Sequence, residues 1–281
     1  MENIYDDLNK QIQVEGKQWI AGETSVSGLN EEEKKVLLGY IPYEGDLILK
    51  EHESVPEKEQ DEYDQAFPKK CDWRLWKNIV TPVKDQKNYG ACVSFAVAAT
   101  LDSRLRVFQK IMNWSISGNM SPGHLYFTAK PGNFQTAYAF MKSHGITTEK
   151  YCPFPQEKPN EGWEKHLTKI GHYLQIEANK PLMMKTELRW NGPLSVAMKV
   201  YDDFFQYKEG IYRKTENAIF KGYHAVCCVG YNDEEQAWIC KNSWGTGWGM
   251  DGFFKIGYGE CNIEVDACIP LDFTSAAYYM A

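Results

Sequence analysis

The stretch Gln86–Phe95, "QKNYGACVSF", decides how this chain is interpreted. It places Cys92 after a Gly-Ala turn and at the start of "ACVSFAVAATLDSRLRVFQKI", whose apolar pattern predicts one long helix. Only the thiolate form of a cysteine is a good nucleophile, and the N-terminus of a helix favours negative charge. Cys92 is therefore a candidate nucleophile, although a lone cysteine before an apolar helix is more often a packing residue.

Two later motifs supply the partners that a nucleophilic thiol needs. His224, in "KGYHAVCCVGYN", opens an apolar strand-like run and can act as the base. Asn242, in "KNSWGTGWG", can accept from the second imidazole nitrogen, with Trp244 shielding that hydrogen bond from water. Gln86 can donate its side-chain amide to a developing oxyanion, together with the backbone N–H of Cys92. Each residue alone is weak evidence, but their combination indicates nucleophilic catalysis.

The order of the predicted elements from Cys71 onward indicates an α+β fold. Two short helices, at about 121–130 and 134–144, should follow the helix that begins at Cys92. After about residue 170 the pattern becomes strand-like, with short apolar runs separated by Gly, Asn and Asp turns. A helical half that precedes a β half predicts two lobes with a cleft between them.

Composition excludes several other classes of function. The chain has 281 residues, of which 43% are hydrophobic, so it can bury a full core. It has no stretch of 18 apolar residues and no basic patch interleaved with aromatic residues, so neither a membrane nor a nucleic acid is expected as a partner. Eight cysteines show no zinc-ligand spacing. We therefore expect no metal and no cofactor.

These motifs resemble the papain family of cysteine peptidases. "CDWR" and "VTPVKDQKNYGACVSFA" are similar to the family's mature amino terminus and nucleophile helix, "GYHAVCCVGY" to its histidine strand, and "WICKNSWGTGWGMDGFFKI" to its Asn-Ser-Trp block. The resemblance covers residues 69 to 270. It implies a papain-like two-lobed fold, with a helical left lobe at about 85–170 and an antiparallel β-barrel-like right lobe at about 171–270. It also implies peptide-bond hydrolysis through an acyl-enzyme, with Cys92, His224, Asn242 and Gln86 as catalytic residues.

The resemblance extends to residues that would bind a peptide substrate. "PGNFQTAYAF" is similar to a glycine segment that lines the family's substrate cleft, so Gly132 is expected to bind the backbone of an extended peptide. Asp266 corresponds to an acidic residue at the bottom of a side-chain pocket in cathepsin B, and is expected to favour Arg or Lys at the second residue before the scissile bond. The other candidates for substrate binding are Phe134, Ala197, Gly222, Tyr223 and Trp244.

The sequence departs from the family pattern beside the nucleophile. Tyr89 and Val93 stand where the family usually has a cysteine and a tryptophan, and the partner of that cysteine is missing as well. The loss of both partners fits a reducing environment or a bacterial-type variant. For a remaining disulfide, we consider Cys71 with Cys268 the candidate pair.

Residues 1–68 are expected to form an inhibitory propeptide and linker, ahead of a catalytic domain at 69–281. "KQWIAGETSVSGLNEEEKKVLLGYIP" is similar to the short leader of cathepsin B and its bacterial relatives. Residues 1–68 hold 6 Lys and Arg against 17 Asp and Glu, a net charge of -11, whereas residues 69–281 hold 25 against 21, a net charge of +4. This opposite charge favours docking of the leader in cis, which low pH would weaken.

Local patterns predict two helices and a cleavage region in the leader. Apolar residues at helical spacing indicate a helix at 4–16, and a second helix begins at Asn30, has a capping box with Glu33 and ends near Gly39. The polar segment between Glu51 and Lys70 has little to bury, and we expect cleavage to the mature enzyme there.

The sequence leaves some functional alternatives open. Residues 130–170 contain nothing like the occluding loop of cathepsin B, so we expect a cleft open at both ends and endopeptidase activity. A transamidase or deamidase would use the same thioester, and a catalytically silent binding protein could retain the fold. We expect a monomer. No signal peptide is visible, which favours the cytoplasm or export by another route.

Overall fold

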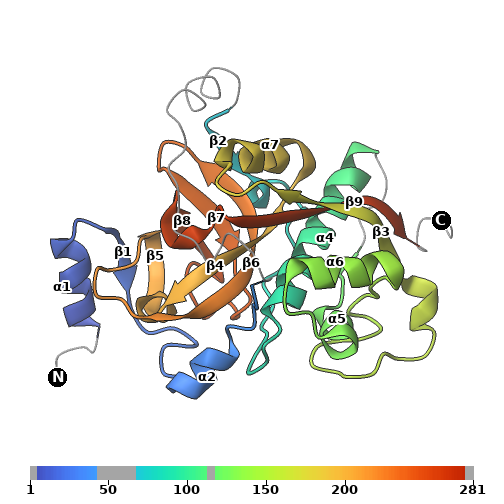
Figure 1. The fold of residues 1–281 in the computed structure, drawn as a ribbon, viewed down its shortest axis with the longest axis horizontal. Helices are drawn as coiled ribbons and strands as arrows, with labels where there is room; N and C mark the ends of the chain where they lie inside the picture. Colours follow the sequence, from blue (N-terminus) through green and yellow to red (C-terminus); the bar gives the residue numbers. More distant parts are fainter. Residues whose placement is uncertain (1–4, 43–67, 113–117, 276–281) are drawn as a thin grey trace.

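The computed structural model describes residues 5–42, 68–112 and 118–275, and it has a helical half and a sheet-containing half (Figure 1). The helical half contains α4 (Cys92–Ile111), α5 (Pro122–Ala129) and α6 (Phe134–Ser143). These bounds confirm the three helices expected after Gln86. Helix α4 packs against strand β6 (Phe220–Asn232) of the other half, which brings the start of α4 to the junction.

The described strands form a sheet of nine strands that does not close into a barrel. Along the sheet the order is β1, β5, β8, β7, β6, β4, β9 and β3, and β2 pairs separately with β6. The pairing of β5 with β8 is parallel, whereas the others are antiparallel. The expected papain-like fold class is confirmed, and the structure adds that the sheet is open and contains one parallel pairing. Besides β6, the strands are β1 (Gln18–Ala21), β2 (Lys70–Asp72), β3 (Thr168–Ile176), β4 (Leu194–Tyr201), β5 (Tyr207–Tyr212), β7 (Ala237–Lys241), β8 (Phe253–Gly257) and β9 (Asp266–Ser275).

The leader contributes two helices and one strand. Helix α1 (Asp6–Val14) lies within the predicted span, and α2 (Glu31–Val36) has the expected capping box between Asn30 and Glu33. Helix α2 ends at Val36, so the expectation that Gly39 terminates it was wrong. In Figure 1, α1 and β1 lie at the outer edge of the sheet, beyond β5. The predicted cleavage region lies mostly outside the described residues.

The sheet-containing half also holds a helix that strand-like patterning did not predict. Helix α7 (Pro181–Asn191) interrupts the region after residue 170. Its signal was present, because Pro181 occupies the first turn and good helix formers such as Leu and Met follow it. The short 3-10 helices are Trp73–Leu75, Trp163–His166, Asp202–Gln206 and Glu260–Asn262.

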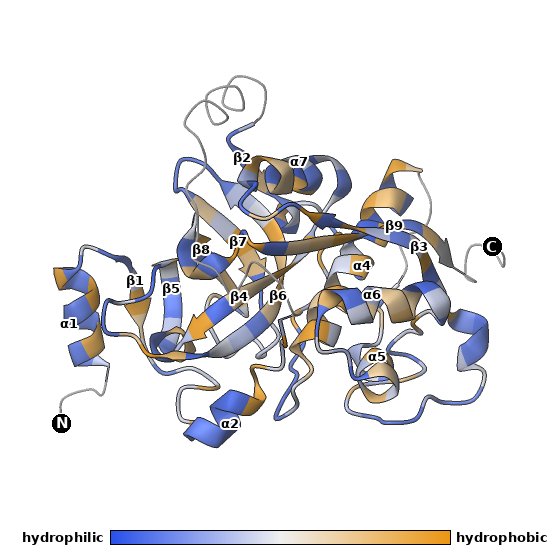
Figure 2. Cartoon of the chain, viewed as in Figure 1, coloured by the Kyte–Doolittle hydropathy of each residue, from blue (hydrophilic) through white to orange (hydrophobic). Residues whose placement is uncertain are grey.

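Two large clusters of buried apolar side chains stabilise this arrangement. One lies within the sheet-containing half and includes Trp238 and Phe254, and the other joins the two halves and includes Val97, Leu101 and Tyr138. Figure 2 shows that α2 of the leader is mostly hydrophilic, as expected for a helix at the surface. Within the described residues, no helix is both long and apolar enough to span a membrane.

All eight cysteines are free thiols, so the expected pair of Cys71 with Cys268 is not a disulfide. The two residues belong to different surroundings. Cys71 lies in β2 at the end of β6, where its thiol faces the carbonyl of Leu188 at 3.9 Å. Cys268 is fully buried in β9, in the cluster that joins the two halves. Two residues expected near the same edge of the β lobe need not be close enough for a disulfide, because bonding requires a short distance between their Cα atoms.

Candidate active site

The first residue of α4 is the predicted nucleophile, Cys92. No side chain caps the N-terminus of α4, so its first backbone N–H groups are available to an anion. Burial raises the pKa of the Cys92 thiol to about 11. Backbone hydrogen bonds from Ala225, Gly39 and Val93 lower this pKa, but their effect is smaller than that of burial. Ala225 directly follows His224 on β6, so the backbone next to the predicted base reaches the Cys92 thiol. With the leader bound, the Cys92 thiol is protonated and fully buried.

His224 lies on β6 and is held by Asn242. Nε2 of His224 is 2.8 Å from Oδ1 of Asn242, and that oxygen also accepts the backbone N–H of Ser243 at 2.8 Å. An amide oxygen only accepts, so Nε2 carries the hydrogen and Nδ1 is left as the base. The Trp244 ring lies over the imidazole, with centroids 4.8 Å apart and an interplanar angle of 34°. The ring therefore covers the imidazole, while its role in shielding the hydrogen bond stays a prediction.

The base is almost completely removed from water. His224 and Trp244 are at most 1% exposed. Burial lowers the pKa of His224 to about 4, while the hydrogen bond to Asn242 and the backbone of Leu37 act to raise it. The buried imidazole is therefore neutral, but a base with so low a pKa is a weak acceptor for a thiol proton, so the site covered by the leader is not prepared for catalysis.

Gln86 is oriented by a residue that sequence reasoning missed. Its side-chain oxygen accepts from Oγ of Ser243 at 2.6 Å, and its backbone N–H donates to the Ser243 carbonyl at 2.8 Å. This fixes the amide so that Nε2 donates to the carbonyls of Tyr89 and Leu37, at 2.8 and 3.2 Å. The motif containing Ser243 was recognised, but nothing in the sequence pairs it with Gln86, 157 residues away.

The leader crosses this site at Leu37–Ile41. The Leu37 carbonyl accepts the amide of Gln86, which is the donor expected to bind an oxyanion. Gly39 lies against Gly90, so closely that a Cβ on Gly39 would be 2.3 Å from the Gly90 carbonyl oxygen. The backbone N–H of Ile41 donates to the carbonyl of Gly132 at 2.7 Å. The leader therefore occupies the positions that a peptide substrate would need.

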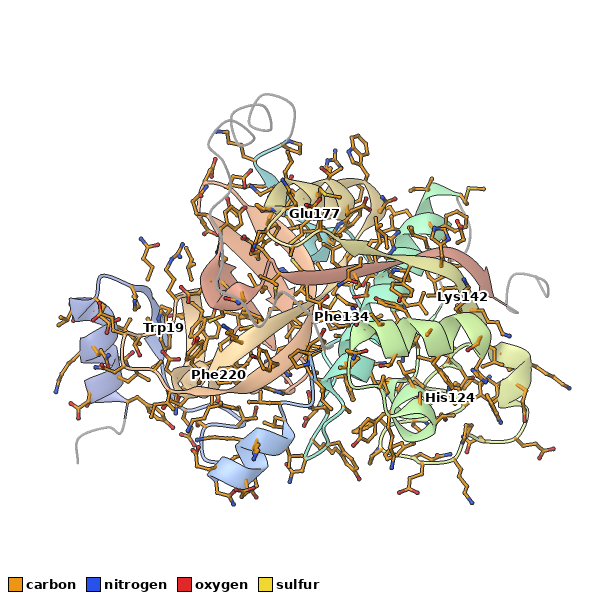
Figure 3. All side chains as sticks on the ribbon, viewed as in Figure 1. Trp19, His124, Phe134, Lys142, Glu177 and Phe220 are labelled. Carbon is orange, nitrogen blue, oxygen red and sulfur yellow. The ribbon has the colours of Figure 1, made fainter. Side chains whose placement is uncertain are left out.

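The residues predicted to bind substrate lie around the same segment. Phe134 begins α6, where the helical half meets the sheet (Figure 3), and its ring centroid is 5.2 Å from that of Tyr40. The phenol of Tyr40 donates to Oδ2 of Asp266. A Cβ on Gly222 would contact the side chain of Leu38. Ala197 and Tyr223 belong to the apolar cluster that contains Tyr40 and Phe134, whereas Trp244 lies on the imidazole instead.

Charge and sheet contacts hold the rest of the leader in place. Lys221, next to Gly222, pairs with Glu31 of α2 at 2.6 Å. Strand β1 pairs with β5, and the Trp19 indole donates to the carbonyl of Arg213 at 2.9 Å. Figure 3 shows Trp19 at the edge of the sheet, far from Phe134. The leader is thus attached both beside the site and at a distance from it.

Comparison with known proteins agrees with this geometry. Residues 67–271 match the model of the papain family cysteine protease. The chain is 30% identical over 222 residues to a cathepsin L-like proteinase of Fasciola hepatica, covering 74% of this chain and 66% of that protein. It is 31% identical over 220 residues to the cathepsin B-like CP2 of Giardia intestinalis, covering 71% and 73% respectively. A match to falcipain-2b of Plasmodium falciparum, 32% identical over 260 residues, covers 84% of this chain and 51% of that protein.

Solved structures with a leader have the same fold. A procathepsin B from Trypanosoma congolense aligns with a TM-score of 0.76 at 22% identity, covering 95% of this chain and 97% of that one. A digestive procathepsin L from Tenebrio molitor larvae also aligns with a TM-score of 0.76, at 24% identity, covering 95% and 88%. The family model and the relatives with 30% identity or more establish the relationship. The chain belongs to the papain family of cysteine proteases.

Proposed function

We propose that this protein is a cysteine endopeptidase made as an autoinhibited zymogen. The observation that carries the proposal is the convergence of Cys92, the His224–Asn242 pair and Gln86 at the start of α4. The names of the protease relatives support hydrolysis over the transamidase, the deamidase and the silent binding protein. No segment between residues 130 and 170 resembles the occluding loop of cathepsin B. This supports cleavage within a peptide chain over removal of dipeptides from its end.

The chemistry follows from the roles of the four residues. Nδ1 of His224 takes the proton of the Cys92 thiol, and the sulfur attacks the peptide carbonyl carbon. The oxyanion forms within reach of the Gln86 amide and the Cys92 backbone N–H. Protonated His224 then gives its proton to the leaving amine as the C–N bond breaks, which leaves a thioester on Cys92. Water, deprotonated by His224, hydrolyses the thioester and restores the thiol.

The leader acts as the inhibitor in cis. Its segment Leu37–Ile41 blocks the site, so a substrate binds only after this segment leaves. We assign residues 1–68 to this propeptide and its linker, as a short leader of the cathepsin B kind, and residues 69–281 to the enzyme. The bacterial-type origin stays a prediction.

The proposal is tested by incubating the full chain from pH 4 to 8 with a reductant. Mass spectrometry follows the leader, and a fluorogenic dipeptide follows hydrolysis. We expect a loss of about 60–70 residues together with the appearance of activity, and neither in Cys92→Ala. A leader-deleted chain that hydrolyses no peptide and is not alkylated at Cys92 would contradict the proposal. Amine acceptors added to the same assay would reveal a transamidase.

A further inference from the structure

A buried lysine stands directly before Asn242 and has no part in the chemistry described above. Lys241 ends β7 and is 5% exposed. Its Nζ donates to the carbonyl oxygen of Thr81 at 2.8 Å and to the hydroxyl oxygen of Thr81 at 2.9 Å. The Thr81 side chain is buried as well. A buried ammonium group is costly unless it is hydrogen-bonded, so this contact holds Lys241 and Thr81 together.

The contact lies at the start of the segment that leads to the oxyanion donor. The six residues from Thr81 to Gln86 are attached on both sides of Asn242. The end of the segment is attached after Asn242, because the backbone N–H of Gln86 donates to the carbonyl of Ser243 at 2.8 Å. The beginning is attached before Asn242, through Lys241 and Thr81. Lys241 therefore helps to fix the path of the chain towards Gln86.

Apolar packing alone does not fix this junction. A cavity of about 20 Å³ is lined by Lys241, Thr81 and Asn242 together with Phe95 and Ala96 from the first turns of α4. Atoms that line a void lose the contacts that would otherwise resist their movement. The hydrogen bonds from Lys241 to Thr81 are therefore an important restraint on the beginning of the segment.

The charge on Lys241 strengthens this restraint at neutral pH. Burial lowers the pKa of Lys241 to about 8. Of the charged and titratable groups around it, Cys227 and Asp102 raise this pKa, whereas Lys84 and Arg106 lower it. At pH 7 the side chain is therefore mostly an ammonium group, whose hydrogen bonds are stronger than those of a neutral amine.

We propose that Lys241 is a positioning residue for peptide hydrolysis and acts through Gln86. Its contact with Thr81 fixes the path of the segment, and this fixes the place of the Gln86 amide at the developing oxyanion. The role rests on the proposed function as a peptidase. A displacement of about 1 Å can cost about 100-fold in rate, so loss of the contact should lower kcat by about 10- to 100-fold.

The test compares Lys241→Met with the wild type after activation of the full chain. Methionine is unbranched, and its thioether donates no hydrogen bond. With a fluorogenic peptide, we expect kcat to fall by about 10- to 100-fold and KM to change by less than about threefold. Alkylation of Cys92 by iodoacetamide forms no oxyanion, so its rate should change by less than about threefold. An unchanged kcat, or an alkylation rate that falls as much as kcat, would overturn the assigned role.

A second comparison shows whether Lys241 acts through Gln86. In a Gln86→Ala background there is no amide to position, so Lys241→Met should lower kcat by less than about threefold further. An equal fall in both backgrounds would contradict the proposal, because the loss would then arise elsewhere in the fold. The amount of Cys92 that can be alkylated counts the active enzyme, so partial loss of folded protein does not alter the measured kcat.

Two variants of Thr81 test the same contact if Lys241→Met does not fold. Thr81→Ser keeps both acceptor oxygens, so its kcat should stay close to that of the wild type. Thr81→Val keeps only the carbonyl oxygen, so its kcat should fall by about 2- to 10-fold. Equal kcat values for the two variants would contradict the proposal while leaving the peptidase function intact. If the leader-free wild type hydrolyses no peptide, the peptidase function fails, and the role of Lys241 fails with it.

Discussion

Gly39 is the leader residue at which the smallest change should release the active site. An alanine there would place its Cβ 2.3, 2.6 and 2.8 Å from the carbonyl oxygen, carbonyl carbon and Cα of Gly90. These are backbone atoms in the turn that leads into α4, so they cannot rotate away as a side chain would. The leader must move instead. Overpacking of this kind costs about 1–3 kcal/mol, which weakens the closed state by about 5- to 150-fold.

Alkylation of Cys92 by iodoacetamide in the intact chain measures this opening directly. Peptide mass spectrometry resolves Cys92 from the other thiols, and short reaction times precede any processing. We expect Gly39→Ala to be labelled about 5- to 150-fold faster than the wild type. Gly28→Ala is the matched control, because a Cβ on Gly28 would meet no atom within 4 Å. If Gly39→Ala and Gly28→Ala were labelled at the same rate, the proposed tight fit of the leader would be refuted.

Two further predictions concern catalysis and pH. Gln86→Ala in the activated enzyme removes an oxyanion donor, so kcat should fall by about 10²–10³-fold with little change in KM, as steady-state kinetics would show. The hydrogen bond from Lys221 lowers the pKa of Glu31 below its ordinary value of 4.5, so the contribution of this pair to docking is present above pH 4.5 and is lost as the pH falls through the lowered pKa. Because the pair is exposed, Glu31→Gln should speed Cys92 labelling at pH 7 by no more than about fivefold.

The candidate catalytic residues could be selected from the sequence because each carries a local signal, and the structure brings them together. Cys92 begins an apolar helix, His224 opens an apolar strand, and Asn242 stands in a motif rich in turns. The two-lobed fold followed from the order of the helical and strand-like regions. Helix α7 was missed because strand-like runs on either side outweighed its Pro181 start.

The contacts of the leader could not be predicted in the same way. Tyr40 and Asp266 are 226 residues apart, and Gln86 and Leu37 are 49 apart, so no periodicity connects either pair. The edge pairing of β1 with β5 also joins residues far apart in sequence, such as Gln18 and Ile211. Resemblance to a zymogen indicated that residues 1–68 would dock. Only the structure identifies which leader side chain fills which pocket.

Because of where the leader binds, cleavage of the chain and opening of the active site are two separate steps. Strand β1 pairs with β5, and Trp19 is 3% exposed, with its ring centroid 5.2 Å from that of Tyr212. A cut between Glu51 and Lys70 breaks none of these contacts, nor those of Leu37–Ile41. The cut fragment keeps its edge strand, its buried indole and its blocking segment, and loses only the high effective concentration that covalent linkage gives. We therefore predict that activation requires departure of the blocking segment as well as proteolysis, and that acid, by weakening ion pairs of the leader, acts on this second step.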